Sequence, residues 1–148
     1  MVKVEKCLFG VPEIEFLGHS VDATGIKPLS KKVKAIKNFP KPCNVKGLER
    51  FLGMVNFYHS FVPHAAEIVQ PLYKALSGCL RPKTLVWSDV MNMAFKKTKE
   101  ALAGAAMLHH PVRYAPTALT SDASDTAIGA VLEQKIKGRW RLLAFFSR

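Results

Sequence analysis

The sequence predicts an α+β protein in which a β-hairpin comes first, helices follow and strands end the chain. Three observations support this fold class. Strand formers surround a turn in residues 8–26, apolar residues recur every three or four positions in the middle, and β-rich runs begin near residue 118. With 148 residues, 49% of them apolar, the chain can form one ordinary domain or two small ones with buried cores.

The first element is the hairpin over residues 8–26. Its strand formers are Val11, Ile14, Phe16 and Val21. Pro12 confines its strand to an edge or a strand start, and residues 22–25 supply turn chemistry. Ser30 is then the expected N-cap of a short helix, which Pro40 and Pro42 end.

Three further helices are expected from the spacing of apolar residues. One begins with Asn44 as N-cap and carries a stripe formed by Leu48, Phe51, Leu52, Val55 and Tyr58. The next covers residues 64–76, where Pro71 is expected to kink or divide it. Residues 78–84 are predicted to be a linker. The last helix covers residues 89–103 with Ser88 as N-cap, and its predicted inward face is Val90, Met93, Ala94, Lys97 and Ala101.

The final third of the chain is predicted to be mostly strand. Residues 118–122, 127–133 and 140–146 form three short β-rich runs. Lys137 and Gly138, between the last two runs, are typical of a hairpin turn. These strands should therefore form an antiparallel sheet.

The charge indicates a polyanionic partner. The formal net charge is +11, and residues 27–46 contain seven lysines and no acid. Such a patch attracts nucleic acid because phosphate neutralisation releases counterions; the alternative is a solvated face that maintains solubility. The three cysteines lack zinc-ligand spacing, and no apolar run is long enough to span a bilayer. We therefore expect neither a zinc site nor a membrane partner, and an intracellular location in the cytoplasm or nucleus.

Residues 16–19, 25–28, 51–58, 61–63, 121–124 and 128–132 form motifs that follow one another along the chain. Taken in this order, they resemble one family, the reverse transcriptases of gypsy-like LTR retrotransposons. Residues 16–19 (Phe-Leu-Gly-His) and 25–28 (Gly-Ile-Lys-Pro) resemble the end of the palm, and residues 51–58 with 61–63 resemble the thumb helices. Residues 121–124 and 128–132 are similar to the first two strands of the RNase H domain. Each motif is weak alone, but the ordered series is specific.

The resemblance implies a division into three parts. Residues 1–26 correspond to the end of the palm with a primer-grip hairpin, 27–83 to a helical thumb, and 84–148 to a linker helix and the first three strands of an incomplete RNase H-like domain. The implied partners are an RNA–DNA or DNA template–primer duplex and the rest of a polyprotein. The residues expected to contact nucleic acid are Phe16, Leu17, Gly18, His19, Lys31, Lys32, Lys34, Arg50, Gly53, Asn56 and Phe57.

The helix from Asn44 is expected to lie along the minor groove, where a duplex is recognised by shape. Gly53 would then let the backbone approach the nucleic acid; the alternative is that Gly53 and Phe57 pack against the helical core. One departure bears on this prediction. Glu49 stands where the family commonly has arginine or glutamine, and an acid facing phosphates would weaken the grip.

Asp122 resembles the first catalytic carboxylate of RNase H, which uses paired divalent ions such as Mg²⁺. Mg²⁺ needs several carboxylate ligands, and in the family the remaining catalytic carboxylates come from positions that would follow residue 148. Asp125 and Glu133 are better explained as a turn residue and a solvent-facing strand residue. The sequence contains no Asp-Asp pair of the polymerase kind. Both active sites are thus expected to be incomplete.

Three hypotheses remain open. The first is a piece of an RNA-directed DNA polymerase with ribonuclease H activity that grips the duplex and does not catalyse alone. The second is a non-enzymatic nucleic-acid-binding remnant, a domesticated retroelement module. The third is a fragment that does not fold by itself, in which an open strand edge in residues 105–148 invites aggregation.

Overall fold

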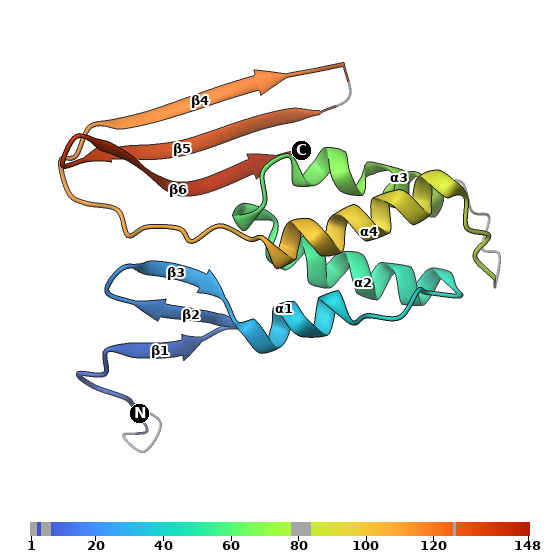
Figure 1. Ribbon diagram of the computed structural model, residues 1–148, viewed down its shortest axis with the longest axis horizontal. Coiled ribbons are helices and arrows are strands. Elements are labelled where there is room, and N and C mark those ends of the chain that lie inside the picture. Colours follow the sequence, from blue (N-terminus) through green and yellow to red (C-terminus); the bar gives the residue numbers. More distant parts are fainter. Residues whose placement is uncertain (1–2, 4–6, 78–83, 126) are drawn as a thin grey trace.

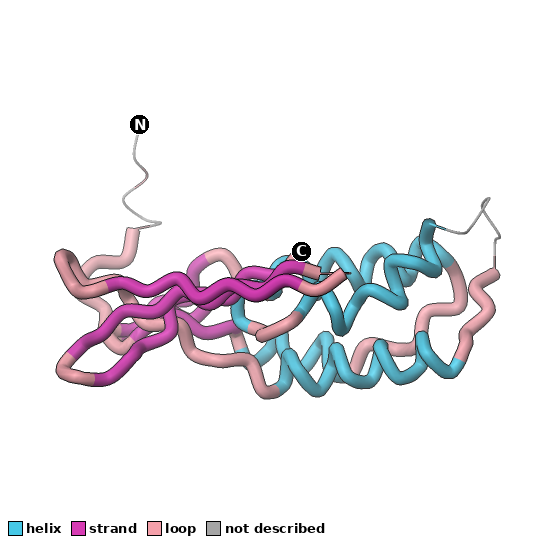
Figure 2. The backbone as a smooth tube through the Cα atoms, turned by 90° about the horizontal axis from the view of Figure 1, so that it is seen from above, coloured by secondary structure: helices cyan, strands magenta, loops and turns pink. Residues whose placement is uncertain are grey.

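The computed structural model describes residues 3, 7–77, 84–125 and 127–148, which form two three-stranded sheets and four α-helices. Figure 1 shows the two sheets toward one end of an elongated molecule and the helices toward the other, and Figure 2 shows the same division from above. The predicted α+β class is confirmed at this level. Of the linker predicted at residues 78–84, only residue 84 lies among the described residues.

The N-terminal sheet has one strand more than the predicted hairpin. Antiparallel strands β1 (Glu13–Phe16), β2 (His19–Asp22) and β3 (Gly25–Pro28) lie in the order β1-β2-β3. The Asp22 carboxylate accepts hydrogen bonds from the Thr24 hydroxyl and amide and from the Gly25 amide, which lowers its pKa to about 2. The predicted turn at residues 22–25 is therefore confirmed. β3 was not predicted because its four residues begin with glycine, end with proline and show no alternation of apolar and polar side chains.

The helices are α1 (Ser30–Lys37), α2 (Val45–Phe57), α3 (Ala65–Ser77) and α4 (Asp89–Ala103), with a 3₁₀ turn, η2 (His59–Phe61), after α2. Two predicted caps are confirmed: the Asn44 Oδ1 accepts from the Gly47 amide at 2.8 Å, and the Ser88 Oγ accepts from the Met91 amide at 3.3 Å. The cap assigned to Ser30 is wrong. Ser30 lies inside the first turn of α1, and Leu29 occupies the N-cap without a side-chain bond.

Two other helix predictions need correction. Pro71 was expected to kink or divide the helix; α3 continues as one helix from Ala65 to Ser77 with Pro71 inside it, so the division is wrong. The inward face predicted for α4 is rotated, because Val90 and Met93 are 62% and 59% exposed. The buried face is instead formed by Met91, Ala94, Phe95, Thr98 and Leu102. Apolar residues occur on both sides of α4, so spacing alone could not choose between them.

The helices enclose the hydrophobic core. The predicted α2 stripe is confirmed, since Leu48, Phe51, Leu52, Val55 and Tyr58 are all buried. Phe51 contacts Phe95 with a ring-centroid distance of 4.6 Å, and Trp87 contacts Phe95 at 5.3 Å. The Trp87 indole N–H also donates to the Pro42 carbonyl at 2.6 Å. These contacts fix α4 against α2 and against the α1–α2 loop.

The C-terminal sheet contains β4 (Thr117–Ala123), β5 (Ile128–Ile136) and β6 (Arg139–Ser147), antiparallel in that order. The three predicted strands and their turn are confirmed, with positive φ at Lys137 and Gly138. Cross-strand partners share a face. One face therefore carries Leu119, Ile128 and Phe146, which are 69%, 53% and 50% exposed. Asp122, Gly129 and Ser147 share the opposite face.

Residues 106–109 connect both sheets to the helices. Leu108 pairs with Ile26 of β3 through two backbone hydrogen bonds of 2.7 and 2.9 Å. The next amide, of His109, donates to the Leu142 carbonyl of β6 at 2.8 Å, and the Ala106 amide donates to the Phe61 carbonyl at 3.1 Å. We call residues 106–109 the connecting segment. It places the β1–β2 turn at a defined position beside α2.

Candidate nucleic-acid interface

The β1–β2 turn is anchored to the end of α2 by a hydrogen bond. Leu17 and Gly18 both have positive φ, 44° and 80°, which is the backbone of a tight hairpin turn. The Tyr58 hydroxyl donates to the Gly18 carbonyl at 2.9 Å. A Cβ at Gly18 would lie 3.0 Å from the Tyr58 hydroxyl oxygen and 3.2 Å from the Phe57 ring. Glycine is therefore needed at this turn for both conformation and space, and burial raises the pKa of Tyr58 above its usual value.

His19 fixes the same turn through aromatic contacts. Its ring stacks on Phe57 and on Phe61, with centroid distances of 5.2 and 5.3 Å, and meets Tyr58 edge-on at 5.5 Å. The first residue of β2 thus lies among rings from the end of α2 and from η2. The turn and α2 consequently form one packed unit.

A groove of about 1050 Å³ opens between this turn, α1 and α2. Eight of the eleven residues predicted to contact nucleic acid line it: Phe16, Leu17, Gly18, His19, Lys32, Arg50, Gly53 and Phe57. The other described lining residues are Ala35, Ile36, Met54 and Tyr58. Lys32 and Arg50 provide positive charge, and this lining includes no acidic side chain. We call this feature the basic groove.

Gly53 and Phe57 lie at the surface of α2 rather than in the helical core. A Cβ built on Gly53 would meet nothing within 4 Å, and the Phe57 side chain is 52% exposed. Within the described residues, no tight packing explains a glycine in the middle of this helix. The backbone of α2 is therefore open to an approaching ligand at Gly53.

Three predicted contact residues lie outside the basic groove. Lys31 forms an ion pair with Glu15, which reduces the charge it offers to a ligand. Lys34 is exposed on α1, and Asn56 lines a separate hollow. Glu49 is also exposed and does not line the groove. The acid that departs from the family pattern therefore does not place its charge within the groove lining.

Asp122 lies on β4 and is exposed. Its Oδ1 accepts a hydrogen bond from the Ala123 amide at 2.9 Å, and it lines a hollow of about 130 Å³ that Glu67 and His64 also line. Asp125 is likewise exposed, while Glu133 is half-buried on β5. Among the described residues, no three His, Cys, Asp or Glu side chains are arranged to hold a metal ion. These residues thus do not fit a divalent ion by themselves.

From the sequence, Tyr58 was predicted only as part of the apolar stripe of its helix, and Phe61 only as part of the motif at residues 61–63. Their contacts with the β1–β2 turn were not predicted. Their contacts with Gly18 and His19 join positions about 40 residues apart. A buried tyrosine usually has a hydrogen-bond partner for its hydroxyl, so the sequence could have predicted that Tyr58 has one. The spacing of residues does not identify which group that partner is.

Comparison with known proteins identifies the relatives of this chain. Residues 87–148 match the family described as the RNase H-like domain found in reverse transcriptase. The retrovirus-related Pol polyprotein from transposon opus of Drosophila melanogaster is 39% identical in an alignment of 155 positions, which covers 99% of this chain and 16% of that protein. The homologues of this chain are retrotransposon Pol polyproteins.

Further Pol polyproteins show the same relationship. The one from transposon 297 of Drosophila melanogaster is 37% identical and matches 90% of this chain. The transposon Tf2-3 polyprotein of Schizosaccharomyces pombe is 30% identical and matches 91%. The chain spans 12% and 10% of these two proteins, a small part of each. The resemblance to retrotransposon reverse transcriptases is thus confirmed.

Solved structures agree with the Pol relationship. The foamy viral protease-reverse transcriptase in complex with dsDNA superposes with a TM-score of 0.80 at 28% identity, covering 92% of this chain and 28% of that chain. The same enzyme in complex with an RNA/DNA hybrid gives a TM-score of 0.78 at 28% identity, covering 93% and 18%. Separately, none of the helices in the described residues is both long and apolar enough to cross a membrane.

Proposed function

We propose that this Pol homologue is the duplex-gripping part of an RNA-directed DNA polymerase with ribonuclease H activity. In this proposal residues 1–26 are the end of the palm and residues 27–83 the thumb. Residues 84–148 are a linker helix and the N-terminal part of the RNase H-like domain. The basic groove holds the template–primer duplex, and the β1–β2 turn holds the primer strand.

The observation that carries this proposal is the basic groove itself. Residues from two distant segments, 16–19 and 50–57, were predicted to contact nucleic acid, and most of them line this one feature. The solved neighbours were determined as complexes with dsDNA and with an RNA/DNA hybrid, which supports the same partner class.

The groove suits a duplex that must be held without regard to sequence. Lys32 and Arg50 lie where they can pair with phosphates, while Phe57 presents a half-exposed ring for packing against sugars. Gly53 lets the helix backbone approach a shallow groove edge. Contacts of this kind recognise backbone and shape, which do not change as a polymerase advances.

Asp122 would supply one carboxylate to a ribonuclease H centre in the complete enzyme. A divalent ion held by Asp122 and other carboxylates would supply Lewis-acid chemistry to that centre. Because the described residues do not form such a site, we assign no catalytic step to this chain. Asp122 is proposed as a metal ligand only together with acids from elsewhere in the polyprotein.

Duplex binding tests the proposal. Fluorescence anisotropy with a blunt RNA–DNA hybrid should give an affinity that falls linearly with salt on a log–log plot. Lys32→Gln and Arg50→Gln should each weaken binding and reduce the slope by about one, as expected for a lost phosphate contact. Lys97→Gln removes the same charge from the exposed face of α4 and should change neither value. Affinity that stays constant with salt would contradict the proposal.

Catalysis provides a second check. These 148 residues should bind a primed RNA template without adding nucleotides in the presence of Mg²⁺, because the sequence has no Asp-Asp pair. Measurable primer extension by this chain alone would show that the catalytic assignment is wrong. A non-enzymatic binding module predicts the same result in both assays, so the reading frames flanking the gene distinguish the two origins.

A further inference from the structure

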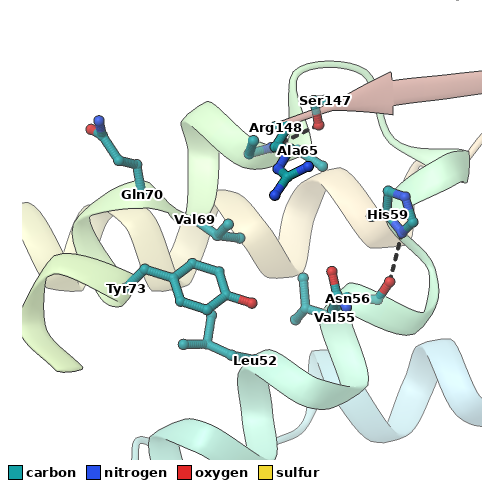
Figure 3. A pocket seen from close by; sticks show the side chains of 11 residues that line it. Leu52, Val55, Asn56, His59, Ala65, Val69, Gln70, Tyr73, Ser147 and Arg148 are labelled. Carbon is teal, nitrogen blue, oxygen red and sulfur yellow. Dashed lines mark hydrogen bonds between the residues drawn. The ribbon is translucent and has the colours of Figure 1, made fainter. Parts of the chain in front are cut away.

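A second hollow, of about 310 Å³, lies on the other side of α2 from the basic groove. It is bounded by α2, by α3 and by the end of β6, as Figure 3 shows. Its apolar floor is formed by Leu52, Val55, Ala65, Ala66 and Val69. Asn56 lines it, one residue before Phe57 of the basic groove. The two features therefore lie on different sides of the same helix and share no lining residue.

Polar and aromatic groups surround this floor. Figure 3 shows the Tyr73 ring on one side with its hydroxyl directed toward Val55 and Asn56, and the Arg148 side chain above the floor. His59 lies at the far end, where its Nδ1 is 2.7 Å from the Asn56 carbonyl oxygen. Tyr73 is 42% exposed, so one part of its ring remains available for contact. The lining contains no acidic side chain.

The position of Arg148 is set by the sheet. Its amide and carbonyl each pair with Ile128 at 2.8 Å, and the neighbouring Ser147 hydroxyl accepts from the Ala66 amide at 2.9 Å. Within the part of the chain that the structure describes, the Arg148 guanidinium forms no ion pair or hydrogen bond. The backbone of Arg148 is thus fixed at the hollow, and its guanidinium lies over the apolar floor without a partner among the described residues.

This combination fits the parts of one nucleotide. The guanidinium suits a phosphate, the apolar floor suits a sugar or base, and an exposed tyrosine ring suits stacking on a base. Bases inside a duplex are already stacked and paired, so a ring such as Tyr73 can reach only an unpaired base. Because Asn56 of the hollow and Phe57 of the basic groove are consecutive residues of α2, a strand that leaves the proposed duplex has one helix to pass before it reaches the hollow.

We propose that this hollow binds an unpaired nucleotide of the strand that continues beyond the duplex, with its base on Tyr73 and its phosphate on Arg148. The inference rests on the proposed function, because the duplex in the basic groove presents the strand to the hollow. It adds a single-strand site to the duplex site and assigns Tyr73 and Arg148 as further contact residues.

Paired probes test the single-strand site. Anisotropy is measured for the 148-residue chain with a blunt RNA–DNA hybrid and with hybrids that carry three unpaired nucleotides at one end or the other of the template. One of the extended hybrids should bind about tenfold more tightly than the blunt hybrid, the effect of one stacked base. Tyr73→Leu should abolish this difference and leave blunt binding unchanged.

Arg148→Gln should reduce the salt slope by about one for that extended hybrid only, and Lys97→Gln is its charge-matched control. Tyr73→Phe should retain the preference, since stacking needs the ring and not the hydroxyl. Equal affinity for blunt and extended hybrids in the unaltered chain would overturn the inference. If Lys32→Gln and Arg50→Gln still weakened blunt binding, the proposed function would stand; if they did not, both would fail.

Discussion

At the scale of single residues, Tyr58 links folding to the proposed grip. Its ring belongs to the helical core and its hydroxyl reaches the Gly18 carbonyl, so one side chain joins α2 to the turn that lines the basic groove. The Gly18 carbonyl also accepts from the Leu29 amide at 3.2 Å. Without the Tyr58 hydroxyl, the Gly18 carbonyl would still accept the bond from Leu29, so only a small loss in the free energy of unfolding is expected.

Tyr58→Phe should therefore lower the free energy of unfolding by about 1 kcal/mol, the usual contribution of one neutral hydrogen bond. The ring and its contacts with His19 and Phe61 remain, so the chain should fold normally. Urea denaturation followed by circular dichroism measures this change. Tyr73→Phe removes a hydroxyl that has no hydrogen-bond partner in the described residues and should leave stability unaltered. An equal loss in both variants would mean that the Gly18 bond contributes nothing.

Among the helices, α2 contains a residue, Gly53, that lowers the stability of the helix but leaves its backbone open to a ligand. A glycine inside a helix costs about 1 kcal/mol relative to alanine, and no neighbour in the described residues requires it. The helix thus keeps an unfavourable residue where the backbone faces the basic groove. This combination is expected where a ligand, rather than the protein, fills the space.

Gly53→Ala should raise the free energy of unfolding by up to about 1 kcal/mol, since the added methyl meets open space. Duplex affinity should fall by about tenfold, which corresponds to about 1.4 kcal/mol of lost contact. Thermal melting and anisotropy on the same samples measure both effects. Gly104→Ala, at the end of α4, is the control and should leave duplex binding as it is. Higher stability with undiminished binding would show that the duplex does not approach Gly53.

Sequence periodicity predicted the elements that have one apolar side and a recognisable cap. Asn44 and Ser88 begin α2 and α4 as expected because each side chain accepts a bond from an amide three residues later. Periodicity failed for α4, whose burial is decided by rings from α2 and from Trp87. It also could not show that Asn56 and Phe57, both predicted to contact nucleic acid, line different hollows on different sides of α2. Which side of a helix meets which neighbour is set by tertiary packing.

At the scale of the whole molecule, the C-terminal sheet leaves one apolar face open. Leu119, Ile128 and Phe146 lie on it, while the opposite face lies toward α3. In the described part of the chain β4 pairs with β5 alone, so its outer edge is also free to pair. Exposed apolar surface next to a free strand edge favours association between copies.

We expect these 148 residues to self-associate as concentration rises, and Leu119→Lys to shift them toward the monomer. A lysine there places charge on the apolar face, on the strand that has the free edge. Sedimentation velocity across a concentration series measures the shift. Val90→Lys alters a similarly exposed apolar residue on α4 and should not affect association. If the two variants behaved alike, the sheet would not be the associating surface.

The connecting segment has a consequence for how this chain tolerates mutation. Its bonds to Ile26, Leu142 and Phe61 all join backbone atoms, so most substitutions along it leave them in place. The sensitive position is Gly25 of β3, opposite the segment, since a Cβ there would lie 2.1 Å from the Leu108 carbonyl oxygen. A chain that accumulates changes at many other positions would keep β3 bonded to the connecting segment, whereas any side chain at Gly25 would force Leu108 away from β3.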